Sequence, residues 1–488
     1  MLNFAPMFDN AKYEWVIGLE VHTQLLTKSK LFCGDSISFG ALPNTQISPI
    51  TLAHPGTLPK MNRKAIEYAV TLGLALDCEI EQHNYFARKN YFYPDLPKGY
   101  QVSQHTTPIC KNGSVKIRVG DTERSIHLNR IHLEEDAGKS LHDVAEHFTA
   151  IDLNRAGTPL LEIVSEPDMH NADEVFAYVT VLRKLVRWLG VCDGNMEEGS
   201  MRCDVNISIR KRGDQKLGTK VEIKNLNSIR NVKRATEFEA KRLMDCMENN
   251  KPIFQETRSF DADKGTTFTL RTKEDADDYR YFPEPDLTPF FISDEFLQKV
   301  KGEMPELPSA LEGKLVNNYG LSNYDASVIC DDHSTVDYFL EAIEGNNNYK
   351  ATANWLLGPV KSYLNEKSSG IESFELKPTS LADLISLVES GKLGFSIAAS
   401  KVFPEMIKDP LKPALQIANE LNLLQERDDA ALEGWVQAAL DKMPQKVKEY
   451  KSGKKGLIGL FAGEVKKLSK GKADMAMVNK LLEQKLNK

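Results

Sequence analysis

Polar and apolar residues alternate along several short segments between residues 13 and 290, and this pattern most constrains the fold. Successive side chains of a β-strand point to opposite faces of a sheet, so an alternating segment predicts a strand with one polar and one apolar face. Residues 202–210 give the longest example, and Lys220, Glu222 and Lys224 repeat it nearby. Two helices, at about residues 173–189 and 229–247, are expected to cover a sheet face. This region is therefore predicted to be α+β and built mainly on antiparallel sheet.

The chain is too long for a single compact domain. Its 488 residues are about three times the usual domain length. Strand-like alternation almost disappears beyond the proline-containing segment at residues 303–309, and Pro404, Pro410 and Pro413 separate off a last helical part. We predict three domains, comprising residues 1–295, 296–410 and 411–488.

Charge is distributed unevenly along the chain. Residues 441–488 contain 13 lysines and 5 acidic residues, a balance of +8, which leaves −15 for the rest because the total is −7. The lysine-rich end indicates contact with phosphate and the acidic body indicates metal-binding pockets, although a solvated helix face would also explain the lysines. No segment approaches the roughly 20 apolar residues of a membrane span, no targeting signal is recognised, and the seven scattered cysteines do not suggest disulfides. A cytoplasmic protein is expected.

The polar faces of the expected strands carry residues that bind metal ions. Glu20 and His22 are two positions apart on an apolar strand, so both side chains leave the same face, where they could hold a divalent cation such as magnesium or manganese. Three acidic residues follow one another at positions 134–136, and Glu162 lies in an otherwise apolar strand where a lone carboxylate is costly to bury. A solvent-facing sheet would show similar alternation. The mixture of acids with Arg, Lys, Asn and His favours a phosphate-and-metal pocket.

The sequence argues against a phosphate-binding loop and against a catalytic nucleophile. Gly138, Lys139 and Ser140 imitate the end of a phosphate-binding loop, but the first glycine should lie at position 133, which is Leu133. No nucleophile motif is present, so covalent catalysis by this chain is not expected. The aromatic and basic segment RKNYFYPD (88–95) is interpreted as structural from its composition, and DYRYFPEPD (278–286) as a rigid charged loop.

Taken together, these segments resemble the GatB/GatE family, the B subunits of tRNA-dependent amidotransferases. The resemblance rests on IGLEVH (17–22), RKNYFYPD (88–95), EEDAGK (134–139), DLNR (152–155), EIVSEPD (162–168), MEEGSMRCD (196–204) and DYRYFPEPD (278–286), and it runs from about residue 14 to the end. It implies a cradle-shaped catalytic domain, a helical domain and a helical tail similar to the small YqeY-like proteins.

The resemblance also implies a reaction. A ligase of this family uses ATP to phosphorylate the side-chain carboxyl of Glu on tRNA(Gln), or of Asp on tRNA(Asn), and ammonia then displaces the phosphate. The ammonia comes from glutamine hydrolysed in the amidase, or A, subunit, and a small C subunit completes the heterotrimer. The sequence leaves open which of the two misacylated tRNAs is used. A non-catalytic tRNA-binding scaffold with an acidic docking face, or less readily a metal-dependent nuclease, would be the alternatives.

By this resemblance, particular residues acquire roles. Glu20, His22, Glu134, Glu135 and Glu162 would be catalytic. The residues expected to hold magnesium ions are Glu20, His22, Glu134, Glu135, Glu162, Asp204 and Glu222. Arg88 and Lys89 would lie near the nucleotide or the ammonia exit, and Arg202 and Lys224 near phosphate. The lysines expected to contact tRNA are Lys454, Lys455, Lys466, Lys467, Lys470 and Lys472.

The chain departs from some family members in one respect. Those relatives bind zinc through two cysteine pairs, whereas this chain has Cys33, Asp35, Ser48 and Thr51 at the corresponding positions. One thiolate does not make a structural zinc site. We therefore expect no zinc, and we expect residues 45–59 to be held by packing instead.

Overall fold

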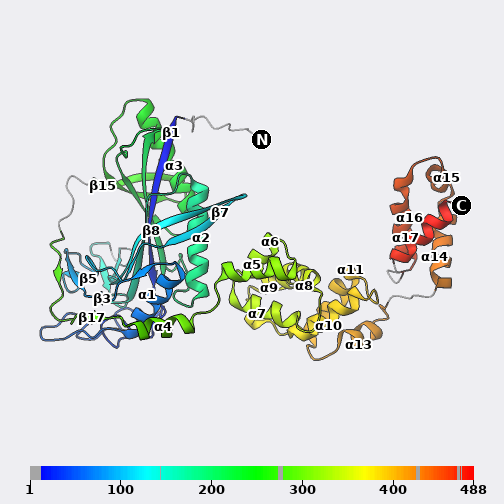
Figure 1. Cartoon of the computed structure of the whole chain (residues 1–488), viewed down its shortest axis with the longest axis horizontal. Coiled ribbons are helices and arrows are strands. Elements are labelled where there is room, and N and C mark those ends of the chain that lie inside the picture. The colour runs from blue at the N-terminus through cyan, green and yellow to red at the C-terminus, as the bar shows by residue number, and fades with distance from the viewer. Residues whose placement is uncertain are drawn as a thin grey trace. The chain divides into compact units, whose positions relative to one another are not determined.

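The computed structural model of the chain describes residues 12–142, 144, 146–272, 279–424, 429–469, 473 and 475–487. The chain divides into two compact units, residues 1–307 and residues 308–488 (Figure 1). The first unit combines sheets and helices and the second is helical, as the α+β prediction requires. Among the described residues, none of the helices combines the length and apolar composition that a membrane span needs.

A ten-stranded sheet organises the first unit. Its strands follow the order β15-β14-β13-β12-β1-β11-β8-β6-β2, with β7 paired to β8 beside this path, and every pair is antiparallel except β13 with β14. Their bounds are β1 (Tyr13–Gln24), β2 (Glu79–Ile80), β6 (Cys110–Lys111), β7 (Ser114–Val119), β8 (Thr122–Glu135), β11 (Pro159–Ser165), β12 (Met201–Lys211), β13 (Val221–Leu226), β14 (Glu256–Asp261) and β15 (Thr266–Thr272). β1 is thus a central strand, with β12 on one side and β11 on the other.

Two long helices pack beside each other on the apolar side of this sheet (Figure 1). They are α2 (Ala172–Trp188) and α3 (Ile229–Glu248), both close to the predicted positions, so these two predictions are confirmed. Asn171 and Ser228 begin them, because each side chain accepts a hydrogen bond from a backbone N–H of the first turn. Apolar side chains of the strands and helices form one continuous core, which leaves the opposite sheet face for the polar residues.

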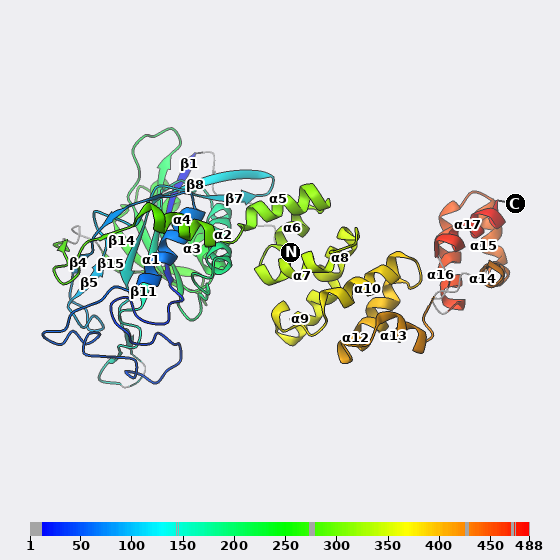
Figure 2. The same ribbon diagram turned by 60° about the horizontal axis from the view of Figure 1, so that its bottom comes forward.

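Shorter elements complete the first unit. Helix α1 packs against α4, which is also visible in Figure 2. The bounds are α1 (Arg63–Ala75), α4 (Asp294–Glu303), β3 (His83–Asn84), β4 (Ala87–Asn90), β5 (Tyr100–Ser103), β9 (Lys139–Leu141), β10 (Ala150–Asp152), β16 (Phe282–Pro283) and β17 (Phe290–Phe291). The small sheets are β16-β4-β5, β17-β3 and β10-β9. Because β16 pairs with β4, the two aromatic segments singled out in the sequence lie side by side.

The second unit is a series of helices. These are α5 (Pro308–Tyr319), α6 (Asn323–Ile329), α7 (His333–Ala342), α8 (Tyr349–Trp355), η1 (Leu356–Val360), α9 (Lys361–Lys367), η2 (Ile371–Ser373), α10 (Pro378–Glu389), α11 (Phe395–Ile397), η3 (Ala398–Val402), α12 (Phe403–Lys408), α13 (Ala414–Glu420), α14 (Asp429–Lys442), α15 (Pro444–Lys451), η4 (Lys455–Leu457), α16 (Ile458–Leu468) and α17 (Met475–Leu486). Helices α14–α17 share a core of their own.

The division between the units falls between Leu307 and Pro308, later than the boundary expected near residue 295. Helix α4 spans residue 295 and buries Val300 in the core of the first unit, which explains the later position. Helix α13 packs on α10 and α12, although it lies beyond residue 410. The three-domain division stays a prediction.

Candidate metal centre on the polar face of the sheet

The polar face of the large sheet brings distant parts of the chain together through strand register. His132 on β8 lies opposite Glu162 on β11, and Glu162 lies opposite His22 on β1. In the same way, Glu20 on β1 is opposite Asp204 on β12. Directly opposite residues of antiparallel strands point to the same face, so these side chains converge.

Among the described residues, His22, Glu134 and Glu162 form the first of two groups that could hold a metal ion, with ligand atoms all within 4.8 Å of one another. The Nε2 atom of His22 lies 3.4 Å from Oε2 of Glu162. His132 stands on the other side, with its Nε2 3.3 Å from the same oxygen and 3.4 Å from Oε2 of Glu134. Ser103 donates a hydrogen bond of 3.1 Å to that Glu134 oxygen. Glu162, the carboxylate that the sequence left without a partner, is thus held between two imidazoles.

Electrostatics in the first group favour ionised side chains. Burial alone would raise the pKa of Glu162, but the neighbouring His132 and His22 outweigh it and hold the pKa well below its usual value. Burial would lower the pKa of both histidines, whereas Glu162 and Glu134 raise it, to about 9 for His132. At neutral pH the Glu162 carboxylate is therefore charged, and His22 would release its proton when its ring nitrogen binds a cation.

Glu20, Asp204 and Glu222 form the second group, again with ligand atoms within 4.8 Å of one another. Asn206 donates a 2.9 Å hydrogen bond to Oε1 of Glu20. Lys224 contacts both Asp204, at 2.5 Å, and Glu222, at 3.1 Å. Three carboxylates and one ammonium leave this group with a charge of −2 when all are ionised (−3 + 1). Burial, together with the charges of Glu162, Asp204 and Glu222, raises the pKa of Glu20.

The donor atoms of both groups suit a hard divalent cation. Five of the six side chains are carboxylates and the sixth is the imidazole of His22. Carboxylate oxygens are preferred ligands of magnesium and manganese. A cation would relieve the repulsion between carboxylates that, after burial, raises the pKa of Glu20. The residues present therefore fit such an ion in each group.

Glu135 does not join these groups. It lies between Glu134 and Asp136 on β8, so its side chain leaves the opposite face, where it pairs with Lys98 and accepts a 2.9 Å hydrogen bond from the N–H of Val102. The sequence-based assignment treated positions 134 and 135 alike. Strand parity separates them, because residues two apart share a face and neighbours do not.

Three of the four predicted cationic residues lie close to acidic groups of this face. Arg202 donates a 2.9 Å hydrogen bond to Asp136. Lys224 joins the second group, as described above. Lys89 lies over the rings of Tyr91 and Tyr279, and although burial would lower its pKa, Glu134 and Glu162 are among the charges that raise it.

Arg88 has a different environment. Its guanidinium forms two 2.7 Å hydrogen bonds to Glu284, one to each carboxylate oxygen, and lies over the rings of Tyr100 and Phe282. It therefore joins β4 to the charged loop at residues 279–286. These contacts hold the loop against β4, and the expected place of Arg88 near the nucleotide or the ammonia exit stays a prediction.

Asp35 binds the side chains of Cys33 and Thr51, which occupy positions where some relatives have zinc-binding cysteines. Cys33 donates a 3.2 Å hydrogen bond to Asp35, and Thr51 donates another to the same carboxylate oxygen. The fully buried ammonium of Lys30 approaches Thr51 at 3.4 Å and donates to the carbonyl of Leu153 at 3.2 Å. Polar contacts thus help to hold Thr51, and the packing expected for residues 45–59 stays a prediction.

The predicted tRNA-contacting lysines lie in the second unit. Lys454 pairs with Glu449 at 3.1 Å, and Lys455 lies over the ring of Tyr450. Lys466 and Lys467 are exposed near the end of α16. Lys470 and Lys472 lie outside the described residues.

His132, Ser103 and Asn206 were missed as site residues by the sequence reasoning. The rule that residues two positions apart on a strand share a face would have found His132, which is two positions before Glu134 on the same expected strand. The same rule places Asn206 beside Asp204. Ser103 comes from β5, outside the large sheet, and no local pattern marks it.

Comparison with known proteins gives one consistent family. A profile of the GatB/GatE catalytic domain matches residues 15–298, and a GatB domain profile matches residues 337–486. A relative from Thermodesulfovibrio yellowstonii is 47% identical over 471 residues, covering 96% of this chain and 98% of the relative. Relatives from Chlorobium chlorochromatii and Syntrophotalea carbinolica are 48% and 46% identical, covering 97% and 98% of this chain and 99% of each relative. All three are named as the B subunit of an aspartyl/glutamyl-tRNA(Asn/Gln) amidotransferase. The chain belongs to the GatB/GatE family.

Proposed function

We propose that this chain is the activating subunit of a tRNA-dependent amidotransferase. It uses ATP to phosphorylate the side-chain carboxyl of Glu on tRNA(Gln), of Asp on tRNA(Asn), or of both, and ammonia then displaces the phosphate to form the amide. The family and the names of its relatives support this reaction class. The observation that carries the proposal is the convergence of six acidic or imidazole side chains from five strands on one face of one sheet.

In this proposal each of the two groups of side chains holds its own magnesium ion. His22, Glu134 and Glu162 would hold one magnesium ion, and Glu20, Asp204 and Glu222 would hold another. When bound, magnesium neutralises phosphate oxygens and polarises an acyl oxygen.

Neighbouring side chains orient these ligands. His132 fixes the orientation of Glu162, and Asn206 that of Glu20, so both carboxylates are positioned before substrate arrives. Lys89, Lys224 and Arg202 surround them with positive charge that would attract phosphate. Glu135 and Arg88 are left out of the proposed catalytic set because other contacts engage them.

The proposed chain works within a larger assembly. Its relatives are named as B subunits, which implies further subunits. The sequence shows no nucleophile motif, so glutamine hydrolysis is assigned to the amidase (A) subunit, with the small C subunit as the third partner. The exposed lysines of helices α14–α17 would contact the tRNA backbone.

Phosphate release tests this function against the alternative of a non-catalytic scaffold. The assembled heterotrimer is incubated with Glu-tRNA(Gln) or Asp-tRNA(Asn) and ATP labelled in its γ-phosphate. We expect labelled phosphate to be released only with a misacylated tRNA, and the release to be lost when Glu20 is replaced by Gln. Release that persists unchanged in that variant would favour the scaffold.

Thermal unfolding of the full chain should reveal the cation and its pH dependence. Magnesium at 100 times its dissociation constant should stabilise the folded chain by about 2.7 kcal/mol. Because the pKa of Glu20 is raised above 4.5, protons compete with the cation, so the stabilisation should be largest above the raised pKa and fade as the pH falls through it. Without magnesium, the stability of the folded chain changes with pH in the opposite direction. The folded chain then binds this proton more tightly than the unfolded chain, so stability declines as the pH rises through the same window.

The check is calorimetry at several pH values with and without magnesium. Glu20→Gln is the control and should lose this pH dependence. A Tm that magnesium leaves unchanged at neutral pH would contradict the proposed centre.

A further inference from the structure

Strand β14 presents two different polar surfaces, and only one of them faces the candidate metal centre. Thr257 lies opposite Glu222 of β13 in the parallel pairing, and its hydroxyl donates a 2.7 Å hydrogen bond to Oε2 of Glu222. Glu256 and Arg258, its neighbours along the strand, leave the other face and meet α3 and β15. Thr257 is 1% exposed and Glu222 is 8% exposed, so water does not replace this bond readily.

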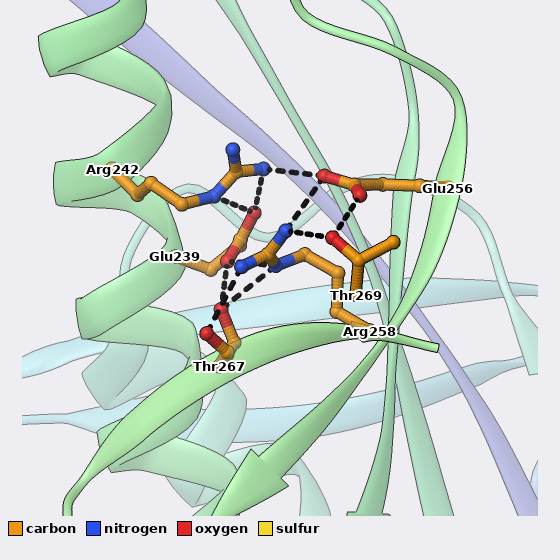
Figure 3. Close-up of polar contacts among 6 residues, drawn as sticks. All are labelled: Glu239, Arg242, Glu256, Arg258, Thr267 and Thr269. Atoms are coloured by element: carbon orange, nitrogen blue, oxygen red, sulfur yellow. Dashed lines mark hydrogen bonds and ion pairs between the residues drawn. The ribbon is translucent and has the colours of Figure 1, made fainter. Parts of the chain in front are cut away.

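A buried ionic network holds β14 in place on its other face (Figure 3). Arg258 donates to Glu256 at 2.8 Å and to the hydroxyl of Thr267 at 2.9 Å, and that hydroxyl donates to Glu239 of α3 at 2.7 Å. Arg242 of α3 bonds both Glu239, at 2.5 Å, and Glu256, at 3.1 Å.

The chemistry of the network fixes the register of β14. Two carboxylates and two guanidinium groups alternate in it, so each charge has opposite charges beside it. A shift of β14 along β13 would leave buried charges without partners, which is strongly unfavourable. The network therefore holds Thr257 level with Glu222.

We propose that Thr257 is a positioning residue, which holds Glu222 in the orientation needed to bind a cation with Glu20 and Asp204, and that the Glu239–Arg258 network keeps Thr257 there. This inference rests on the proposed function. A metal-binding carboxylate must present an oxygen in a fixed direction, and partners that orient the ligand typically change metal affinity about 10- to 100-fold. Lys224, which also contacts Glu222, provides charge but no comparably fixed direction, because its stem is flexible.

The chain offers a matched control for this hydroxyl. Thr236 on α3 is also fully buried, and its hydroxyl donates a 2.8 Å hydrogen bond to the carbonyl of Val232, but it is a member neither of the metal groups nor of the Glu239–Arg258 network. Thr257→Val and Thr236→Val each delete one buried hydroxyl and keep the side-chain shape. If Thr257 were merely structural, the two variants would behave alike.

The experiment measures Mn²⁺ binding to the full-length chain by electron paramagnetic resonance, with thermal unfolding recorded in parallel. We expect Thr257→Val to weaken one class of Mn²⁺ sites about 10- to 100-fold, and Thr257→Ser to restore it. Thr236→Val, which also loses a buried hydrogen bond, should keep the affinity of the parent chain. If Thr257→Val does not fold, the pair Thr257→Ser and Thr257→Ala isolates the same hydroxyl.

Glu222→Gln separates the role of Thr257 from the existence of the metal group. Loss of Mn²⁺ in Glu222→Gln with normal affinity in Thr257→Val would overturn the role of Thr257 and leave the metal centre standing. Equal weakening in Thr257→Val and Thr236→Val would also overturn it, because a general loss of stability would then explain the effect. Normal binding in Glu222→Gln would refute the second metal group itself.

Discussion

Replacing Glu162 by Gln should lower the rate of ATP-dependent amidation by about 10³-fold or more, equivalent to ~4 kcal/mol of transition-state stabilisation. Oε2 of Glu162 lies within 3.4 Å of both His22 and His132, and Glu162 belongs to the first group of ligands. A neutral amide of nearly the same shape removes the negative charge that these imidazoles and the proposed cation share. Amide formation on the misacylated tRNA, measured in the assembled heterotrimer, checks this result.

Two controls make the Glu162 experiment specific. Glutamine hydrolysis by the amidase subunit should remain measurable, since the substitution lies in another chain. Glu166→Gln, four positions along, should amidate normally, because Glu166 accepts a hydrogen bond from Asn129 and is outside both groups of ligands. Normal amidation by Glu162→Gln would refute the site.

Removing residues 429–488 should weaken tRNA binding at least about tenfold, or ~1.4 kcal/mol, at physiological salt. The deletion starts at α14 rather than at residue 411, because α13 packs on α10 and α12 and should stay. The deleted helices have their own core, so the rest of the chain should still assemble with the amidase subunit and the small third subunit. The salt dependence of the dissociation constant should also flatten, by roughly 0.7 to 0.9 in the logarithmic slope for each phosphate that the shortened chain no longer neutralises.

A charge reversal tests the same surface without a deletion. Lys466 and Lys467 are exposed on α16, so replacing both by Glu should leave the helix folded while weakening tRNA binding in a salt-dependent way. Binding isotherms at several salt concentrations, with circular dichroism as the folding control, provide the measurement. Unchanged affinity and slope in both the deletion and the reversal would assign tRNA binding elsewhere.

Local patterns predicted the strands and the two long helices because each depends on a few neighbouring residues. The alternation at residues 202–210 is the polar and apolar division of β12, and the apolar spacing at residues 173–189 is the buried stripe of α2. Parity within one strand also separates Glu134 from Glu135, although the sequence-based assignment did not apply it there.

Contacts between residues far apart in the sequence could not be predicted from such local patterns. Glu20 and Glu222 lie 202 positions apart and meet only because β1, β12 and β13 are neighbours in a particular register. Between β12 and β13 that register shifts near Cys203, which no local pattern reports. The partners of Arg88 and Thr257 likewise come from distant parts of the chain, a loop for the first and another strand for the second. The resemblance placed Arg88 near the nucleotide or the ammonia exit, and nothing in the sequence marked Thr257.

Crystals of the full chain soaked in Mn²⁺ test the central claim most directly. An anomalous difference map should show two peaks, one bounded by His22, Glu134 and Glu162 and the other by Glu20, Asp204 and Glu222. Both should disappear after treatment with a chelator. A map without density at either group would contradict the account.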